Sequence, residues 1–110
     1  MIHVLSQPAT EQQLTEMLEA HGEFIKVAVD VRRRWLAGGG EFHADCESAL
    51  IEDGSRKEDI WGADWLPQHQ MIRYAALINL RSKVNRTMEI SEPAVRQQVE
   101  QVIRKLLQRP

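Results

Sequence analysis

The clearest indication of the architecture comes from residues 24–40, which read Phe24-Ile-Lys-Val-Ala-Val-Asp-Val-Arg-Arg-Arg-Trp-Leu-Ala-Gly-Gly-Gly40. Up to Val31, β-branched residues alternate with charged or small ones, which is typical of a strand with one face in the core. A second apolar group starts at Trp35 and ends before the three glycines. Asp30 can accept hydrogen bonds from the backbone that follows it, so we expect a turn over residues 30–33. This stretch therefore predicts a β-hairpin.

The flanking sequence predicts three more strands and three helices. The strands are expected at residues 2–5, 59–66 and 71–80, and the helices at 10–22, 41–54 and 91–107. Thr10 and Gln13 form a capping-box pattern, and residues 67–70 suit a second hairpin turn. The order β-α-β-β-α-β-β-α, with hairpins instead of crossovers, predicts an α+β fold. We expect one domain (1–110) with a mainly antiparallel sheet of about five strands and two to three helices.

Residues 41–54 allow two interpretations. As a helix they form one apolar stripe, and Gly54 is a suitable stop; as a strand they place Glu41, His43 and Asp45 on one face. The helix accounts for more of the residues and is favoured, with an extended entry at 41–42. Either way, ionisable side chains gather here, and they form the candidate polar site: Glu41, His43, Asp45, Glu47 and Asp53.

This polar site suggests two chemistries. Nitrogen and oxygen ligands suit a divalent cation, and His43 with Asp45 would hold it, helped by Glu41 or Asp53. Alternatively, His43 could act in proton transfer beside Glu47. The simpler interpretation, which we favour, is that the acidic residues complement the positive end of a helix. Cys46 is expected to be a buried thiol and not a nucleophile.

A second polar cluster is the candidate anion-binding site: Asn79, Arg81, Asn85 and Arg86. Arginine binds phosphate or carboxylate through paired donors, although a solvated loop would have the same composition. Arg32–Arg34 is expected to be a solvated turn, with a phosphate contact as the alternative. Trp61 and Trp65 share a strand face and are expected in the core or at a dimer interface.

Composition restricts the function further. With 43% hydrophobic and 27% charged residues the chain is typical of a soluble globular protein, and its net charge of −2 does not favour duplex DNA binding. A single cysteine excludes an internal disulfide. We expect no signal peptide and no membrane span, and hence a cytoplasmic location. A homodimer is the expected assembly, because symmetric pairs are the commonest small oligomers.

Three blocks of the sequence resemble a family of short bacterial and archaeal proteins catalogued as a domain of unknown function. The blocks are Gly39-Gly-Glu-Phe-His-Ala-Asp45, Glu52-Asp-Gly-Ser-Arg-Lys-Glu-Asp-Ile-Trp-Gly62, and Ile78-Asn-Leu-Arg81 followed by Asn85-Arg86. The resemblance implies a single α+β domain and no known activity. In that family an acidic or small residue stands at the position of Cys46, and proline often replaces Ser82.

Three functions follow as hypotheses. The leading one is a binding or regulatory module whose Arg81–Arg86 loop holds a small anionic ligand or a protein partner. The second is a metal-dependent phosphoester hydrolase that uses His43 and Asp45, with phosphate held by arginine. The third is an RNA-cleaving, toxin-like protein with Arg86 and His43 as its acid–base pair, which the acidic balance makes the least favoured.

Overall fold

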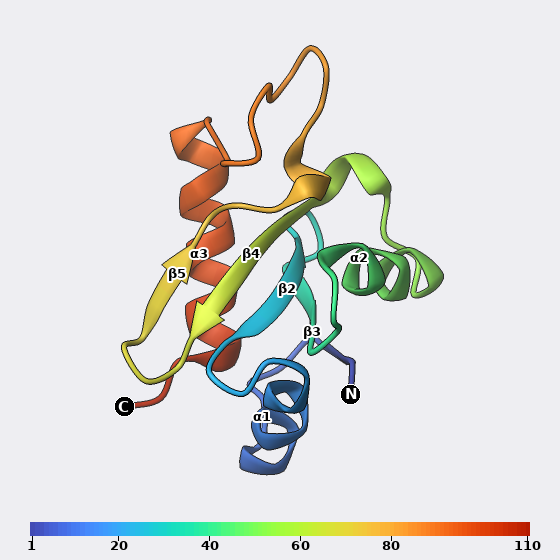
Figure 1. Ribbon diagram of the computed structural model, residues 1–110. Coiled ribbons are helices and arrows are strands. Elements are labelled where there is room, and N and C mark those ends of the chain that lie inside the picture. The colour runs from blue at the N-terminus through green and yellow to red at the C-terminus, as the bar shows by residue number, and fades with distance from the viewer.

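The computed structural model describes residues 1–110 and has a five-stranded antiparallel sheet with strand order β1-β3-β2-β4-β5 (Figure 1). The strands are β1 (His3–Leu5), β2 (Ile25–Asp30), β3 (Trp35–Gly38), β4 (Ile60–Leu66) and β5 (Met71–Arg73). The helices are α1 (Glu11–Met17), α2 (His43–Glu52) and α3 (Pro93–Leu107), with short 3-10 turns η1 (Leu18–Ala20), η2 (Lys57–Asp59) and η3 (Leu77–Asn79). The predicted α+β class and element order are confirmed. None of the helices is both long and apolar enough to cross a membrane.

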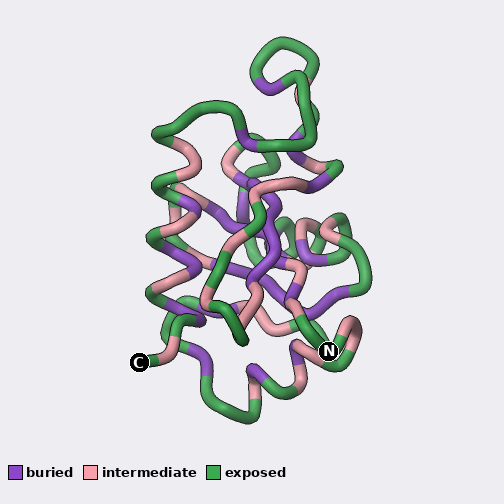
Figure 2. Tube along the Cα trace, turned by 60° about the vertical axis from the view of Figure 1, so that its left-hand side comes forward, coloured by how far each residue is buried: buried purple, intermediate pink, exposed green.

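The sheet is covered on both faces, and the alternation in β2 decides which residues face which layer. Val27 and Val29 join the large core with α1 and α3, whereas Ala28 packs with α2. Because side chains of a strand alternate between faces, one strand serves two cores. Buried residues accordingly follow the strands and the inner sides of the helices (Figure 2).

Several local predictions are confirmed. Thr10 and Gln13 form the capping box of α1. Asp30 accepts hydrogen bonds from the backbone N–H groups of Arg32 and Arg33 and so closes the β2–β3 turn. The ambiguous segment is a helix, entered through an extended residue at Phe42 (φ −126°, ψ 150°). Trp61 and Trp65 are both in the core, so neither contributes an exposed apolar patch.

The predicted strand 71–80 is wrong in extent, since β5 ends at Arg73. Beyond that point the side chain of Asn79 takes the place of a neighbouring strand. Its Oδ1 accepts a hydrogen bond from the Gly62 N–H (2.7 Å), and its Nδ2 donates to the Gly62 carbonyl (2.9 Å). Because the edge of β4 is satisfied in this way, the chain can leave the sheet and form η3.

Candidate functional site

A pocket of about 360 Å³ lies between the start of α2 and residues 75–78. We call it the first pocket. Seven of its nine lining residues are apolar, and the other two are Lys26 and His43. Four of its apolar members are exposed: Phe42, Ala44, Leu77 and Met88. A concave, mostly apolar site with a few polar groups is the usual form of a small-molecule site.

Lys26 is the cation of the first pocket. It projects from β2 on the α2 side of the sheet, and its ammonium group lies 5.6 Å from the centre of the Phe42 ring. The hydrogen bonds and ion pairs of the protein do not include this ammonium. Its cross-strand neighbour is Asp64, but the carboxylate of Asp64 pairs with His43 and Arg73 instead. An unpaired ammonium group therefore lies beside an apolar cavity.

His43 and Asp64 form a fixed pair at the same pocket. The Nε2 atom of His43 lies 2.8 Å from Oδ1 of Asp64 and 3.1 Å from the carbonyl oxygen of Ala63. Both neighbours are acceptors, so Nε2 carries the proton and donates it. Arg73 donates to the other carboxylate oxygen at 3.2 Å. The Nδ1 atom has no hydrogen-bond partner and is not among the atoms shut off from solvent.

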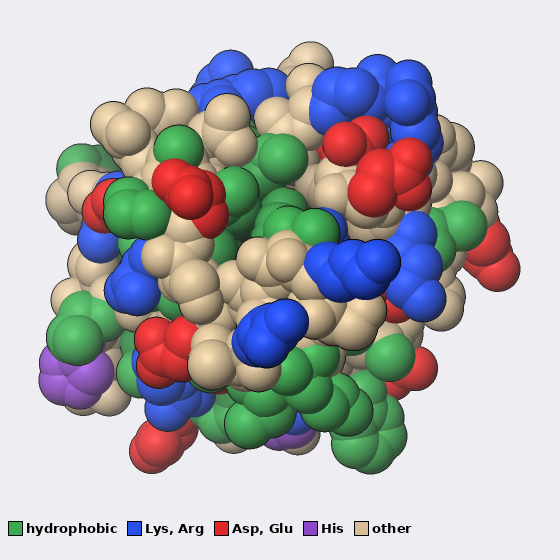
Figure 3. All heavy atoms as spheres, turned by 90° about the horizontal axis from the view of Figure 1, so that it is seen from above, with side chains coloured by type: hydrophobic (Ala, Val, Ile, Leu, Met, Phe, Trp, Pro, Cys, Tyr) green, Lys and Arg blue, Asp and Glu red, His purple; other side chains and the backbone are tan.

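A second pocket of about 450 Å³ adjoins the first, because Ile78 lines both. Arg81 forms part of its wall, with its guanidinium carbon 3.8 Å from the centre of the Trp61 ring. This guanidinium also donates to the carbonyls of Glu58 (2.8 Å) and Ile60. Burial lowers the pKa of Arg81, and nearby carboxylates, Glu47 foremost, oppose that shift. Figure 3 looks onto this end of the molecule, where hydrophobic side chains lie between acidic and basic groups.

The five members of the predicted polar site do not meet. His43 turns to Asp64, while Asp45 accepts a hydrogen bond from the Phe42 N–H and caps α2. Glu47 lines the second pocket, and Asp53 pairs with Arg33; the side chain of Glu41 is exposed. No group of three or more His, Cys, Asp or Glu side chains is placed to hold a metal ion. The divalent-metal site stays a prediction that this arrangement does not favour.

The predicted anion-binding set divides into structural and free residues. Asn79 is fully buried and bonded to Gly62 and Met88. Asn85 donates to three carbonyls, those of Asn79, Thr87 and Glu89, and accepts from the Ser91 N–H. These two amides organise the loop and have little left for a ligand. Arg86 is exposed and lines a separate hollow of about 410 Å³ in the same loop.

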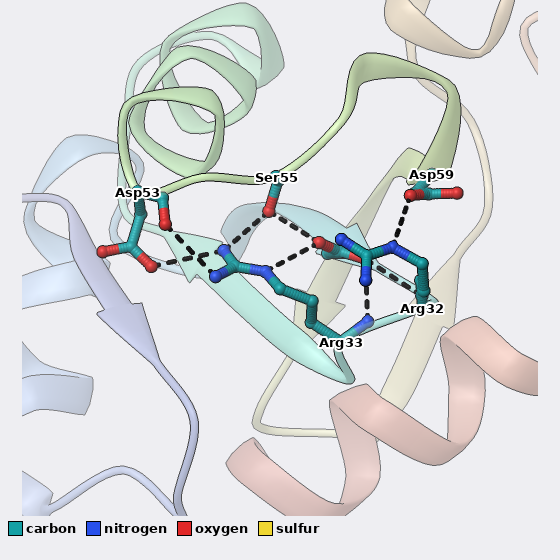
Figure 4. Close-up of polar contacts among 6 residues, drawn as sticks. Arg32, Arg33, Asp53, Ser55 and Asp59 are labelled. Carbon is teal, nitrogen blue, oxygen red and sulfur yellow. Dashed lines mark hydrogen bonds and ion pairs between the residues drawn. The ribbon is translucent and has the colours of Figure 1, made fainter.

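The turn at Arg32–Arg34 is not simply solvated, which corrects the prediction. Arg33 donates to Ser55 (2.7 Å) and pairs with Asp53, and Arg32 pairs with Asp59 (Figure 4). The carboxylate of Asp30 is fully buried and accepts hydrogen bonds from the Ser55 hydroxyl (2.6 Å) and from Nε of Arg33 (3.0 Å). This network joins the hairpin to the end of α2. In the sequence, Asp30 at the end of an otherwise apolar strand could have indicated such a network.

Comparison with protein families agrees with the resemblance. The model of a family described as "Protein of unknown function (DUF5674)" matches residues 3–106 of this chain of 110 residues. The chain belongs to this family. No curated protein and no solved structure matches it. All three sequence blocks that carry the resemblance contribute to the two pockets: His43 comes from the first, Glu58 from the second and Arg81 from the third.

Sequence reasoning missed two residues of this site, Lys26 and Asp64. Each is a charged residue within an apolar strand, and the two strands pair so that they are direct neighbours. A charge in a central strand is the signal that could have indicated them. His43 is 21 residues from Asp64, and whether it reaches Asp64 and the pocket of Lys26 depends on where α2 lies on the sheet.

Proposed function

We propose that this protein is a binding module for a small amphipathic carboxylate, whose apolar part fills the first pocket and whose carboxylate meets Lys26. The observation that carries this proposal is the ammonium group of Lys26, which lies beside an apolar cavity without an acceptor. A charge-assisted hydrogen bond to a carboxylate would satisfy it. Lys26 thus takes the anion-binding role that the sequence suggested for the Arg81–Arg86 loop.

The charges around the first pocket support an anionic ligand. Arg73 pairs with the carboxylate of Asp64, so when His43 is neutral the ammonium of Lys26 is the one charge among the residues that line the pocket. Phe42, His43 and Ala44, at the start of α2, also line the pocket. The backbone N–H groups at a helix start favour negative charge. Asp45 already uses the Phe42 N–H, and the N–H groups of His43 and Ala44 act in the same direction as Lys26.

His43 supplies a second polar contact. Asp64 fixes its tautomer and leaves Nδ1 as the free ring nitrogen. This nitrogen would accept a hydrogen bond from a ligand when neutral and donate one when protonated. We propose that it selects the orientation of the ligand at the pocket edge.

The other functional hypotheses receive less support. A metal-dependent hydrolase requires a group of metal ligands that the described side chains do not form. For the RNA-cleaving hypothesis, His43 and Arg86 would have to meet, but they line different pockets. The cytoplasmic location and the homodimer remain predictions, and light scattering of the purified protein tests the second.

The test is a titration of the full chain with hexanoate, followed by two-dimensional amide NMR. Hexanoate is expected to shift the amides of Ala44, Ala75 and Ala76, and hexanol, which lacks the charge, to bind far more weakly. Lys26→Met keeps the apolar stem and removes the ammonium. It should weaken hexanoate binding by at least about tenfold, the usual size of one charge-assisted hydrogen bond.

The matched control is Lys105→Met, which removes the same charge from the exposed face of α3. It is expected to leave hexanoate affinity unchanged. Equal binding of hexanoate and hexanol, or equal loss of binding in both variants, would show that Lys26 does not recognise the carboxylate.

A further inference from the structure

The second pocket contains a carboxylate oxygen that no donor reaches. Oε2 of Glu47 is buried and has no hydrogen-bond partner, and Glu47 lines the pocket of about 450 Å³. Buried polar atoms are almost always paired, and an unpaired carboxylate oxygen is among the most costly to bury. Oε1 of the same carboxylate also has no partner in the protein and is not shut off from solvent, so it is the atom that a ligand in this pocket can reach.

The cations nearby do not supply that donor. The guanidinium of Arg81 is directed at the carbonyls of Glu58 and Ile60 and lies over the ring of Trp61. It forms no ion pair with Glu47. Lys57 is exposed at the rim, where solvent and salt weaken its effect on the pocket. The positive charges that balance Glu47 and Glu58 thus leave the buried oxygen unpaired.

The remaining walls are apolar. Ile78, Leu80 and Val84 line the pocket, and Leu80 and Val84 are 45% and 74% exposed. Exposed aliphatic side chains around a hollow are typical of a surface that meets another apolar group. The pocket therefore combines a carboxylate that has no donor in the protein with walls suited to a hydrocarbon chain.

We propose that the second pocket binds a primary ammonium or guanidinium group on an apolar stem, with Glu47 as its acceptor. A lysine or arginine side chain of a peptide has this chemistry, and so does a free alkylamine. A cationic donor makes a stronger hydrogen bond to a carboxylate than a neutral one. This inference does not rest on the proposed function, because it concerns a different pocket and a ligand of opposite charge.

The experiment titrates the full chain with n-pentylamine, 1-pentanol and a lysine blocked at both ends, and follows the indole N–H of Trp61 by NMR. Trp61 lines the pocket and reports on it directly. We expect pentylamine and the blocked lysine to shift this signal and pentanol to bind more weakly. Tighter binding of the blocked lysine would identify a peptide as the source, and tighter binding of pentylamine a free amine.

Glu47→Gln removes the charge and keeps the shape, and should weaken pentylamine binding by at least about tenfold. The control is Glu52→Gln, an exposed residue of the same helix that should leave binding unchanged. Glu47→Asp withdraws the carboxylate without removing its charge and should also weaken binding. Hexanoate binding at the first pocket shows that each variant is folded.

Three results would overturn the proposal. They are an unchanged Trp61 signal with every amine, equal affinity for pentanol and pentylamine, and full affinity in Glu47→Gln. If hexanoate binds while amines do not, only this inference fails. If amines bind while hexanoate does not, only the proposed function fails; in that case the melting temperature of each variant provides the folding check.

Discussion

Replacing Asn79 by alanine should destabilise the fold strongly. The side chain is fully buried and makes three hydrogen bonds: it accepts from the Gly62 N–H and donates to the Gly62 and Met88 carbonyls. The Met88 carbonyl also accepts from the Ala76 N–H (3.0 Å), so it keeps a partner when Asn79 is removed. The two Gly62 groups would stay buried without partners. At about 1–3 kcal/mol for each orphaned group, the loss in unfolding free energy is about 2–6 kcal/mol.

Urea unfolding followed by tryptophan fluorescence measures this loss, and thermal melting should show a decrease of about 10 °C or more. Asn79→Asp is the more specific variant, because it keeps the size and replaces the donating amide by an acceptor that faces two carbonyls. It should be at least as destabilising. The exposed Gln97→Ala is the control and should change stability by less than about 0.5 kcal/mol. A loss below about 1 kcal/mol in both Asn79 variants would refute the view that this amide replaces a strand.

Three further predictions concern other parts of the sheet. Gly62→Ala should cost about 1–3 kcal/mol in urea unfolding, because an added Cβ would lie 2.6 Å from the Cβ of Ala76; a neutral result would mean that residues 76–78 shift easily. Burial raises the pKa of the Cys46 thiol to about 11, so it should react with a thiol reagent only at the rate of unfolding, and rapid labelling of the native protein would contradict its burial. Burial also acts to raise the pKa of Asp30, but the hydrogen bonds from Ser55 and Arg33 outweigh it and the pKa is lowered. Because the folded pKa lies below the unfolded one, this stabilisation is present above about pH 4 and is lost as the pH falls through the folded pKa. Stability should therefore fall less steeply on acidification in Asp30→Asn than in the parent, and identical slopes would count against the assignment.

Local chemistry made much of the fold predictable. The alternation in β2, the capping box at Thr10 and the apolar stripe of α3 each depend on residues close in sequence, and each is confirmed. The turn at Asp30 belongs to the same class, because an aspartate bonds to the backbone two and three residues ahead. The strand 71–80 was too long because its end depends on Asn79 reaching β4, a contact across 17 residues.

The candidate site shows the same division. From the sequence, His43, Glu47 and Arg81 could be recognised as polar residues near apolar ones, and each could be assigned to an element. Their surroundings depend on the packing of the whole chain: His43 meets Asp64, Glu47 lines a pocket without a donor, and Arg81 lies over the face of Trp61. Periodicity encodes the face on which a residue lies, since that depends on local backbone geometry. It does not encode which residue of another element lies opposite, because that is fixed by how α2 and the 75–90 segment pack on the sheet.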